Sequence, residues 1–233
     1  MSASTDRALA RLLQLASPAL PVGAYSYSQG LESAVEAGIV RDAATALRWI
    51  GDALSLNLAR FEAPLWCRLH AAWLAGEHPG VRRLNDWFRA TRETAELRAE
   101  SLQMGYSMRR LFVDLGAGAG RFDARALAEL EAMDEPALPT AFTFAVAQWE
   151  IPARDALIAY LWSWLENQVM AALKAVPLGQ TDGQRVLMAL GDRLSVIAAD
   201  ALCADETAFA NFAPGLAIAS SRHETQYSRL FRS

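Results

Sequence analysis

The chain is poor in the residues that build disulfide frameworks, metal centres and β-sheets. Its 233 residues include two cysteines, three histidines and one lysine. Two cysteines make no disulfide framework, and so few histidines argue against a metal-dependent hydrolase. Valine and isoleucine number 10 and 6, against 46 alanines and 32 leucines. Because alanine and leucine lose little entropy in a helix whereas β-branched residues lose rotamer freedom there, this balance predicts an all-α fold.

A strong positive charge and a clean membrane span are also missing. The net charge is −4, which argues against a nucleic-acid partner. The most apolar stretch, 153–176, is too rich in polar groups for a membrane span, so we expect a helix buried on nearly all sides. Its polar side chains are Arg154, Asp155, Glu166, Asn167, Gln168 and Lys174. The N-terminus has no clean signal-peptide layout, so we expect a cytoplasmic protein without a membrane partner.

One glycine-rich segment suggests an enzyme. Residues 114–120 read DLGAGAG, the pattern of S-adenosylmethionine-dependent methyltransferases. Such a loop is meaningful only after a strand and within alternating strands and helices, whereas residues 98–110 upstream indicate a helix. We therefore favour a connector between helices and keep the methyltransferase as an alternative. The phosphate-binding pattern G-x-x-x-x-G-K-[ST] does not occur, so we expect no nucleotide hydrolysis, no cofactor and no catalytic residue.

Cys67 and His70 are the other chemical candidates. They lie three residues apart, so on one helix both could face a metal such as nickel. Two ligands make a weak site, and Trp66 and Leu69 beside them indicate a buried face. We favour a core cysteine beside a partly exposed histidine and expect no metal site. A protein that carries nickel directly stays open as an alternative.

Apolar residues recur at helical spacing through most of the chain. Leu47, Ile50, Leu54 and Leu58 share one face of a helix that Asp42 can cap. Prolines, glycines and capping residues mark the other ends. The predicted helices cover about residues 7–15, 28–38, 43–76, 86–115, 126–133, 141–149, 152–174 and 183–203. With shorter pieces included, we expect one compact domain of about nine to ten helices over residues 1–233.

The C-terminal end differs from the rest. Pro214-Gly215 interrupts the pattern, and the end of the chain carries three arginines against one glutamate, with Tyr227 and Phe231 among them. A frayed terminus is one explanation. The other is a segment that becomes ordered on a partner, since arginine and tyrosine are favoured at interfaces. We therefore predict that residues 205–233 form an interaction tail.

Longer motifs resemble the urease accessory protein UreF family. Residues 12–32 read LLQLASPALPVGAYSYSQGLE, and residues 34–38 continue with AVEAG. Residues 91–98 (TRETAELR) are similar to the central helix of the family, and residues 171–180 (AALKAVPLGQ) to its next block. The end of the chain, 218–233, reads IASSRHETQYSRLFRS and looks like the end of the family.

These motifs follow the family order over nearly the whole chain. Residues 76–86 and 116–139 carry little family signal. One departure is Ala24, where relatives often have a second glycine after Gly23. This departure matters little if the backbone φ at that position is negative.

The resemblance implies an all-α scaffold without catalytic activity. Proteins of this family dimerise and bind the accessory protein UreD, called UreH in some organisms, and the GTPase UreG. The assembled complex delivers Ni²⁺ to urease apoprotein. By resemblance we expect the same partners here, and a possible effect on GTP hydrolysis by UreG.

The matching motifs also imply partner-binding residues. In the first motif, Tyr25, Tyr27, Gln29 and Glu32 would face UreG or the dimer surface. A core position for Tyr25 is an equal alternative. Residues from the later motifs would complete the contacts: Lys174, Gln180, Arg222, His223, Glu224, Tyr227 and Arg229. For Lys174 the alternative is a cation that stabilises a helix C-terminus by about 0.3–1 kcal/mol.

Overall fold

The computed structural model describes residues 3–116 and 122–232. It is 76% helical, and the described residues contain no strand, which confirms the all-α expectation. Helix α3, the π-helix η2 and helix α4 follow one another without a break. When they count as one, the described part of the chain has ten helices, in agreement with the predicted nine to ten.

The elements follow closely on one another along the chain. Their bounds are α1 Ala3–Ala16, η1 Ala24–Ser26, α2 Leu31–Glu36, α3 Ala43–Ala53, η2 Leu54–Glu62, α4 Ala63–Ala75, α5 His78–Ala90, α6 Ala95–Gly116, α7 Ala124–Ala132, α8 Leu138–Gln148, α9 Ala153–Ala175, α10 Gln180–Cys203, η3 Glu206–Ala208 and α11 Pro214–His223. Two pieces, η1 and η3, are 3₁₀-helices.

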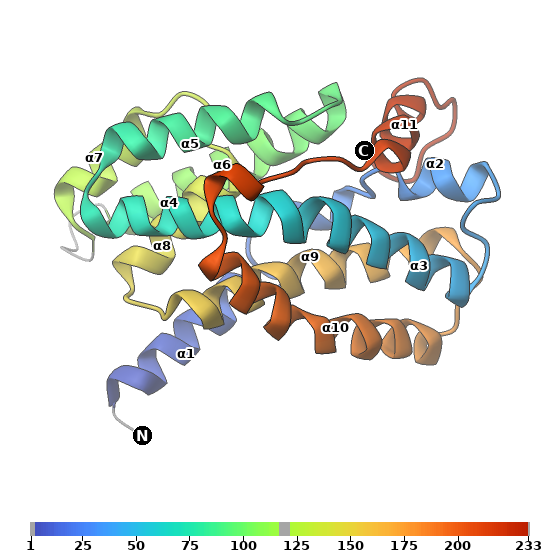
Figure 1. Cartoon of the computed structure of the whole chain (residues 1–233), viewed down its shortest axis with the longest axis horizontal. Coiled ribbons are helices and arrows are strands. Elements are labelled where there is room, and N and C mark those ends of the chain that lie inside the picture. The colour runs from blue at the N-terminus through green and yellow to red at the C-terminus, as the bar shows by residue number, and fades with distance from the viewer. Residues whose placement is uncertain (1–2, 117–121, 233) are drawn as a thin grey trace.

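Helix α9 lies at the centre and contacts α1, α2, α3, α4 and α10 (Figure 1). Leu157, Leu161 and Leu165 are fully buried within it, as the sequence predicts for the most apolar stretch. Helices α5 to α8 cover one end of the molecule, and α11 lies beside α2 at the other. Buried apolar side chains from α1 to α10 pack in one continuous cluster, the arrangement that the proposed single domain requires.

Most predicted helix ends are confirmed. The Asp42 side chain accepts a hydrogen bond from the backbone N–H of Thr45 and caps α3. Asp123 caps α7 in the same way, and Pro152 precedes α9. Gly38 has φ +70°, the left-handed conformation expected of a glycine that ends a helix.

Two predicted helices differ from the observed ones: the first begins later, and the second is divided in two and begins at His78 rather than at residue 86. The helix predicted from residue 28 begins only at Leu31, because Gln29 and Gly30 have positive φ angles of 54° and 79°. The single helix predicted over 86–115 breaks into α5 and α6 at residues 91–94. There the Thr94 hydroxyl accepts a hydrogen bond from the Leu97 N–H and so begins a new helix.

The nine-residue π-helix η2 was not predicted. The Ala63 N–H donates a hydrogen bond to the Leu58 carbonyl, five residues earlier, and this spacing is typical of the wider turn of a π-helix. The Arg60 carbonyl accepts a hydrogen bond from the Ala210 N–H, in the segment that leads to α11. The predicted apolar face is nevertheless buried from Ile50 to Leu58.

Replacing Leu194 tests the packing of α10 on the core. Leu194 is 1% exposed, so Leu194→Ala should lower the free energy of unfolding by about 2–5 kcal/mol. Val196 lies on the same helix but is 60% exposed, and Val196→Ala should change stability by less than about 0.5 kcal/mol. Urea denaturation followed by circular dichroism measures both. Equal losses would contradict the packing described above.

Candidate partner-binding site

The C-terminal tail folds back onto its own chain. Helix α11 packs against α2 and α6. Its Ser220 hydroxyl lies 2.8 Å from the hydroxyl of Thr94, and both side chains are buried. A Cβ built on Gly30 would lie 2.8 Å from the Ser220 nitrogen, so only glycine allows this approach. This close contact joins the first sequence motif to the last.

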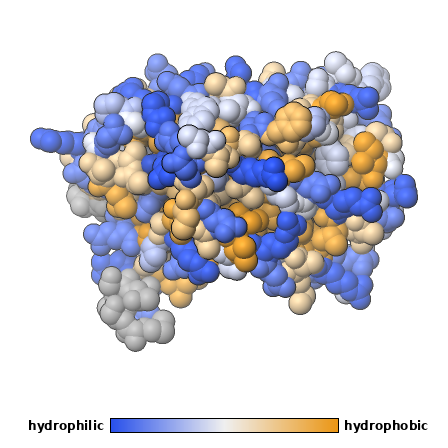
Figure 2. Space-filling model, viewed as in Figure 1, coloured by the Kyte–Doolittle hydropathy of each residue, from blue (hydrophilic) through white to orange (hydrophobic). Residues whose placement is uncertain are grey.

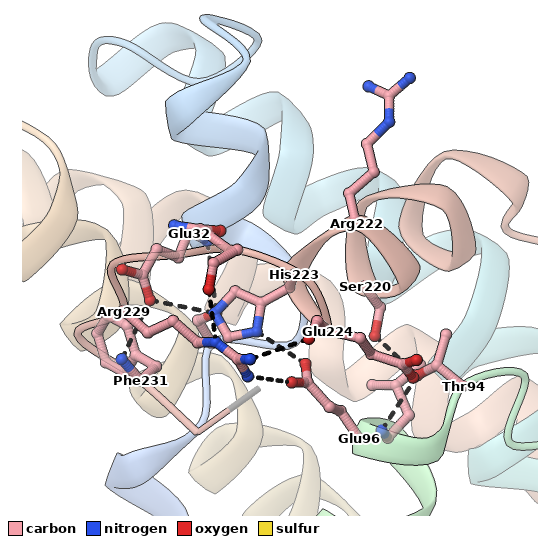
Figure 3. A network of polar contacts seen from close by, with 12 residues as sticks. Glu32, Thr94, Glu96, Ser220, Arg222, His223, Glu224, Arg229 and Phe231 are labelled. Atoms are coloured by element: carbon pink, nitrogen blue, oxygen red, sulfur yellow. Dashed lines mark hydrogen bonds and ion pairs between the residues drawn. The ribbon is translucent and has the colours of Figure 1, made fainter.

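Four side chains form what we call the C-terminal clasp: Glu32, Glu96, His223 and Arg229 (Figure 3). His223 is fully buried at its centre. Its Nδ1 lies 2.7 Å from Glu96 Oε2, and its Nε2 lies 3.2 Å from Glu32 Oε2. Each ring nitrogen thus faces a carboxylate oxygen, an arrangement that suits an imidazolium, which donates at both positions.

Arg229 closes the clasp from the solvent side. Its Nη1 donates to Glu96 Oε1 at 2.7 Å, and its Nη2 and Nε donate to the carbonyls of Glu224 and Gln226 at 2.9 and 3.0 Å. All three guanidinium nitrogens therefore bond within the chain. A contact between the Arg229 guanidinium and a partner would require these hydrogen bonds to open.

Glu32 holds the last turn of the tail. Its two carboxylate oxygens accept hydrogen bonds from the N–H groups of Leu230 and Phe231, at 2.7 and 3.0 Å. Phe231 is buried as a result, and its ring lies 5.5 Å from the Lys174 ammonium group. Lys174 is in the last turn of α9, where a cation also suits the helix C-terminus. The last turn of the tail therefore also contacts the C-terminal end of α9.

The side chains of the first motif point inward. The Tyr25 hydroxyl donates to Glu166 at 2.9 Å, and burial together with this carboxylate raises the pKa of Tyr25 far above its ordinary value. Tyr27 is buried, and Gln29 Nε2 donates to Glu100 at 2.7 Å. These contacts favour a structural role for these residues. Their predicted contact with partners stays a prediction.

Other predicted residues are free to meet a partner. Arg222 points away from the body of the protein (Figure 3), and Tyr227 is completely exposed. Ile218 and Leu230 are exposed by 54% and 70%. Figure 2 shows apolar side chains over α11 among charged ones. We call Ile218, Arg222, Tyr227 and Leu230 the tail surface.

Two further predicted residues, Gln180 and Glu224, belong neither to the clasp nor to the tail surface, and two residues at the start of α6 were missed. The Glu224 side chain accepts a hydrogen bond from the Ala95 N–H at the start of α6, and Gln180 begins α10. Glu96 belongs to the clasp and Thr94 contacts Ser220, but neither was predicted as a site residue. Their place in the motif 91–98 was the available signal.

The chemical candidates from the sequence fall elsewhere. Cys67 is half-buried, and burial raises the pKa of its thiol to about 12. His70 is buried rather than partly exposed, and it stacks on Trp66 with ring centroids 5.5 Å apart. Among the described residues, no group of three His, Cys, Asp or Glu side chains is placed to hold a metal.

The glycine-rich segment is only partly described. Asp114 belongs to α6, so it follows a helix and not a strand. Residues 117–120 of the methyltransferase-like pattern lie outside the described residues. Over the described ranges, no helix is long and apolar enough to cross a membrane.

Comparison with known proteins agrees with the family resemblance found in the sequence. The UreF family model matches residues 40–191. The urease accessory protein UreF of Azoarcus sp. (strain BH72) is 64% identical over 225 residues, which cover 97% of this chain and 95% of that protein. The chain belongs to the UreF family.

Further relatives extend this UreF-family match. UreF of Dechloromonas aromatica (strain RCB) is 55% identical over 97% of both chains. A bifunctional urease accessory protein UreEF of Bordetella bronchiseptica is 50% identical over 97% of this chain and 52% of its own length. A UreF-like unit therefore also occurs as one half of a longer protein.

Removing the Glu32 carboxylate tests the clasp. Glu32→Ala leaves His223 Nε2 and two tail amides without the carboxylate that they contact, so the free energy of unfolding should fall by roughly 3–5 kcal/mol. Glu36→Ala, an exposed position on the same helix, is the matched control. Hydrogen exchange at residues 224–232 should rise only in Glu32→Ala. Unchanged exchange there would refute the clasp.

Substituting Gly30 tests the contact between α2 and α11. Gly30→Ala combines a positive φ with a clash against Ser220, whereas Gly23→Ala has nearly the same φ and open space. The two variants share the cost of a left-handed alanine, about 1–2 kcal/mol. Gly30→Ala should cost roughly 1–3 kcal/mol more, the range for overpacking. Equal melting temperatures for the two variants would show that the contact is loose.

Proposed function

We propose that this protein is a non-catalytic urease accessory protein that assembles with UreD (UreH) and the GTPase UreG. In that complex it would help to insert nickel into urease apoprotein, and it could modulate GTP hydrolysis by UreG. Membership of the UreF family, whose named relatives are urease accessory proteins, is the observation that carries the proposal.

The tail surface supports a scaffold role. It combines an exposed arginine and an exposed tyrosine with two exposed aliphatic side chains, and arginine and tyrosine are favoured at interfaces. The clasp fixes the backbone of residues 224–231, so less loop entropy remains to be lost on binding. We propose that the tail surface binds UreD, and that it contributes to binding UreG within the assembled complex.

A second surface suits a homodimer. Trp162 on α9 and Met188 on α10 are exposed by 37% and 71%. The Trp162 ring lies across Gly191 on α10, where an added Cβ would come within 3.3 Å of it. We propose that a second copy covers this face, since large exposed apolar side chains on adjacent helices mark interaction sites.

Substitutions on the tail surface separate binding from folding. Tyr227→Ala removes a fully exposed side chain, so stability should change by less than about 0.5 kcal/mol. Affinity for UreD should fall by about thirtyfold or more, the loss that a hot-spot residue of 2 kcal/mol causes. Size-exclusion chromatography with light scattering, using UreD and then UreG with GTP and Ni²⁺, measures assembly.

Gln184→Ala, at an exposed position on α10, is the control for this experiment. A stoichiometric complex that Tyr227→Ala weakens and Gln184→Ala does not would support the proposal. If the wild-type protein forms no complex with folded partners, the scaffold role is wrong. If Tyr227→Ala assembles normally, the role stands but the tail surface is not the contact.

A further inference from the structure

The two contacts of the His223 ring depend on its charge. The ring is fully buried, and Glu96 Oε2 and Glu32 Oε2 lie 2.7 and 3.2 Å from its two nitrogens (Figure 3). A neutral imidazole has one N–H donor and one acceptor nitrogen, whereas an imidazolium donates from both, and an ionised carboxylate only accepts. Between two carboxylates, both contacts are therefore hydrogen bonds only when both ring nitrogens carry a proton.

Loss of the second proton disturbs the contact with Glu32. The contact with Glu96 is the shorter one, so the remaining N–H of a neutral ring stays at Nδ1. Nε2 then turns a lone pair toward Glu32 Oε2, and two acceptors face each other at 3.2 Å. The same carboxylate accepts hydrogen bonds from the N–H groups of Leu230 and Phe231. A change of charge at the ring thus acts directly on the last turn of the tail.

The charge balance of the clasp changes in the same direction. With an imidazolium, the two carboxylates of the clasp are balanced by His223 and Arg229. Loss of the proton leaves one negative charge without a counter-charge. The side chains of Glu32 and Glu96 are only 9% and 13% exposed, so water screens this charge poorly. Closure of the tail therefore becomes less favourable when the ring is neutral.

The neighbouring elements carry further charged groups, but these bond elsewhere. Helices α2 and α6, which pack against α11, present the two clasp carboxylates to the ring. On α9, the Lys174 ammonium group lies against the Phe231 ring. Arg222 points away from the clasp (Figure 3), and the Glu224 carboxylate accepts from the N–H that begins α6. The balance at the ring is thus left to the four clasp side chains.

We propose that His223 is a pH-sensitive switch: its imidazolium holds the C-terminal clasp closed, and loss of one proton releases residues 224–232. Since the closed form binds one proton more than the open form, the closed form loses stability as the pH rises. Release would free the Arg229 guanidinium and change the orientation of the tail surface. As regulation of partner binding this rests on the proposed scaffold role, whereas the switch itself does not.

NMR of the full-length protein without partners tests the switch from about pH 5.5 to 8.5. The ring ¹⁵N shifts report the protonation of His223, one of three histidines in the chain. Where this ring loses its proton, hydrogen-exchange protection of the Leu230 and Phe231 amides should fall about tenfold per pH unit, after correction for the intrinsic exchange rate. The amide of Leu69, which is buried in α4, should keep its protection.

Glu96→Gln removes the need for the second proton. The remaining side-chain oxygen can still accept from Arg229, and the new amide can donate to Nδ1 of a neutral ring that donates from Nε2 to Glu32. The tail of this variant should therefore stay protected at high pH. Glu131→Gln, at an exposed position on α7, removes the same charge and should behave like the wild-type protein.

Tail protection that stays constant while the His223 ring loses its proton would overturn the proposal. So would a ring that keeps one protonation state over the whole pH range. Both results come from the wild-type protein and remain decisive if Glu96→Gln does not fold. A folded Glu96→Gln variant that loses tail protection as the wild-type protein does would also refute the switch. Because no partner is present, failure of the scaffold role would leave these results unchanged.

Discussion

The buried carboxylate of Glu32 is the constraint on which the arrangement of both chain ends depends. A buried carboxylate is tolerated only when hydrogen bonds and opposite charge compensate the lost hydration. Glu32 obtains this compensation from His223 and from the N–H groups of Leu230 and Phe231. The tail must therefore return to α2, and His223 must be buried where Glu96 can contact its other nitrogen. The orientation of the tail surface follows from these contacts, since Tyr227 lies between His223 and Leu230 in the chain.

The first motif serves two parts of the molecule at once. On one side, Gly30 allows the close approach of Ser220, and the Ser26 carbonyl accepts a hydrogen bond from the Arg232 N–H at 2.7 Å. On the other side, the Gln29 side chain donates a hydrogen bond to Glu100 on α6 and accepts one from Trp164 on α9. Short, glycine-containing segments can do this because left-handed backbone conformations redirect the chain within one or two residues. The motif thus connects the tail surface to the interior through a few residues, and its tyrosines pack inward.

The sequence predicted the elements well where the signal is local. Alanine and leucine content, the Asp42 cap and Pro152 act within a few residues, so they indicate helices without knowledge of the fold. The prediction erred where tertiary contacts override local preference. The helix expected over 86–115 breaks where Thr94 bonds to Ser220, 126 residues away, and Arg92 turns inward to Glu62. The π-helix likewise depends on its neighbours, and periodicity does not distinguish its wider turn from an α-helical one.

The sequence by itself determined the helical class, most helix ends and the family of this protein, because composition, caps and motifs are properties of neighbouring residues. It also marked the first and last motifs as special. Only the tertiary structure decided that these motifs meet, since Glu32 and His223 are separated by 191 positions. The tertiary structure also decided which of the predicted site residues stay exposed. Arg229 and His223 bond to other residues of the chain, whereas Arg222 and Tyr227 remain at the surface. The reason is that burial depends on the packing of whole helices and not on residue type.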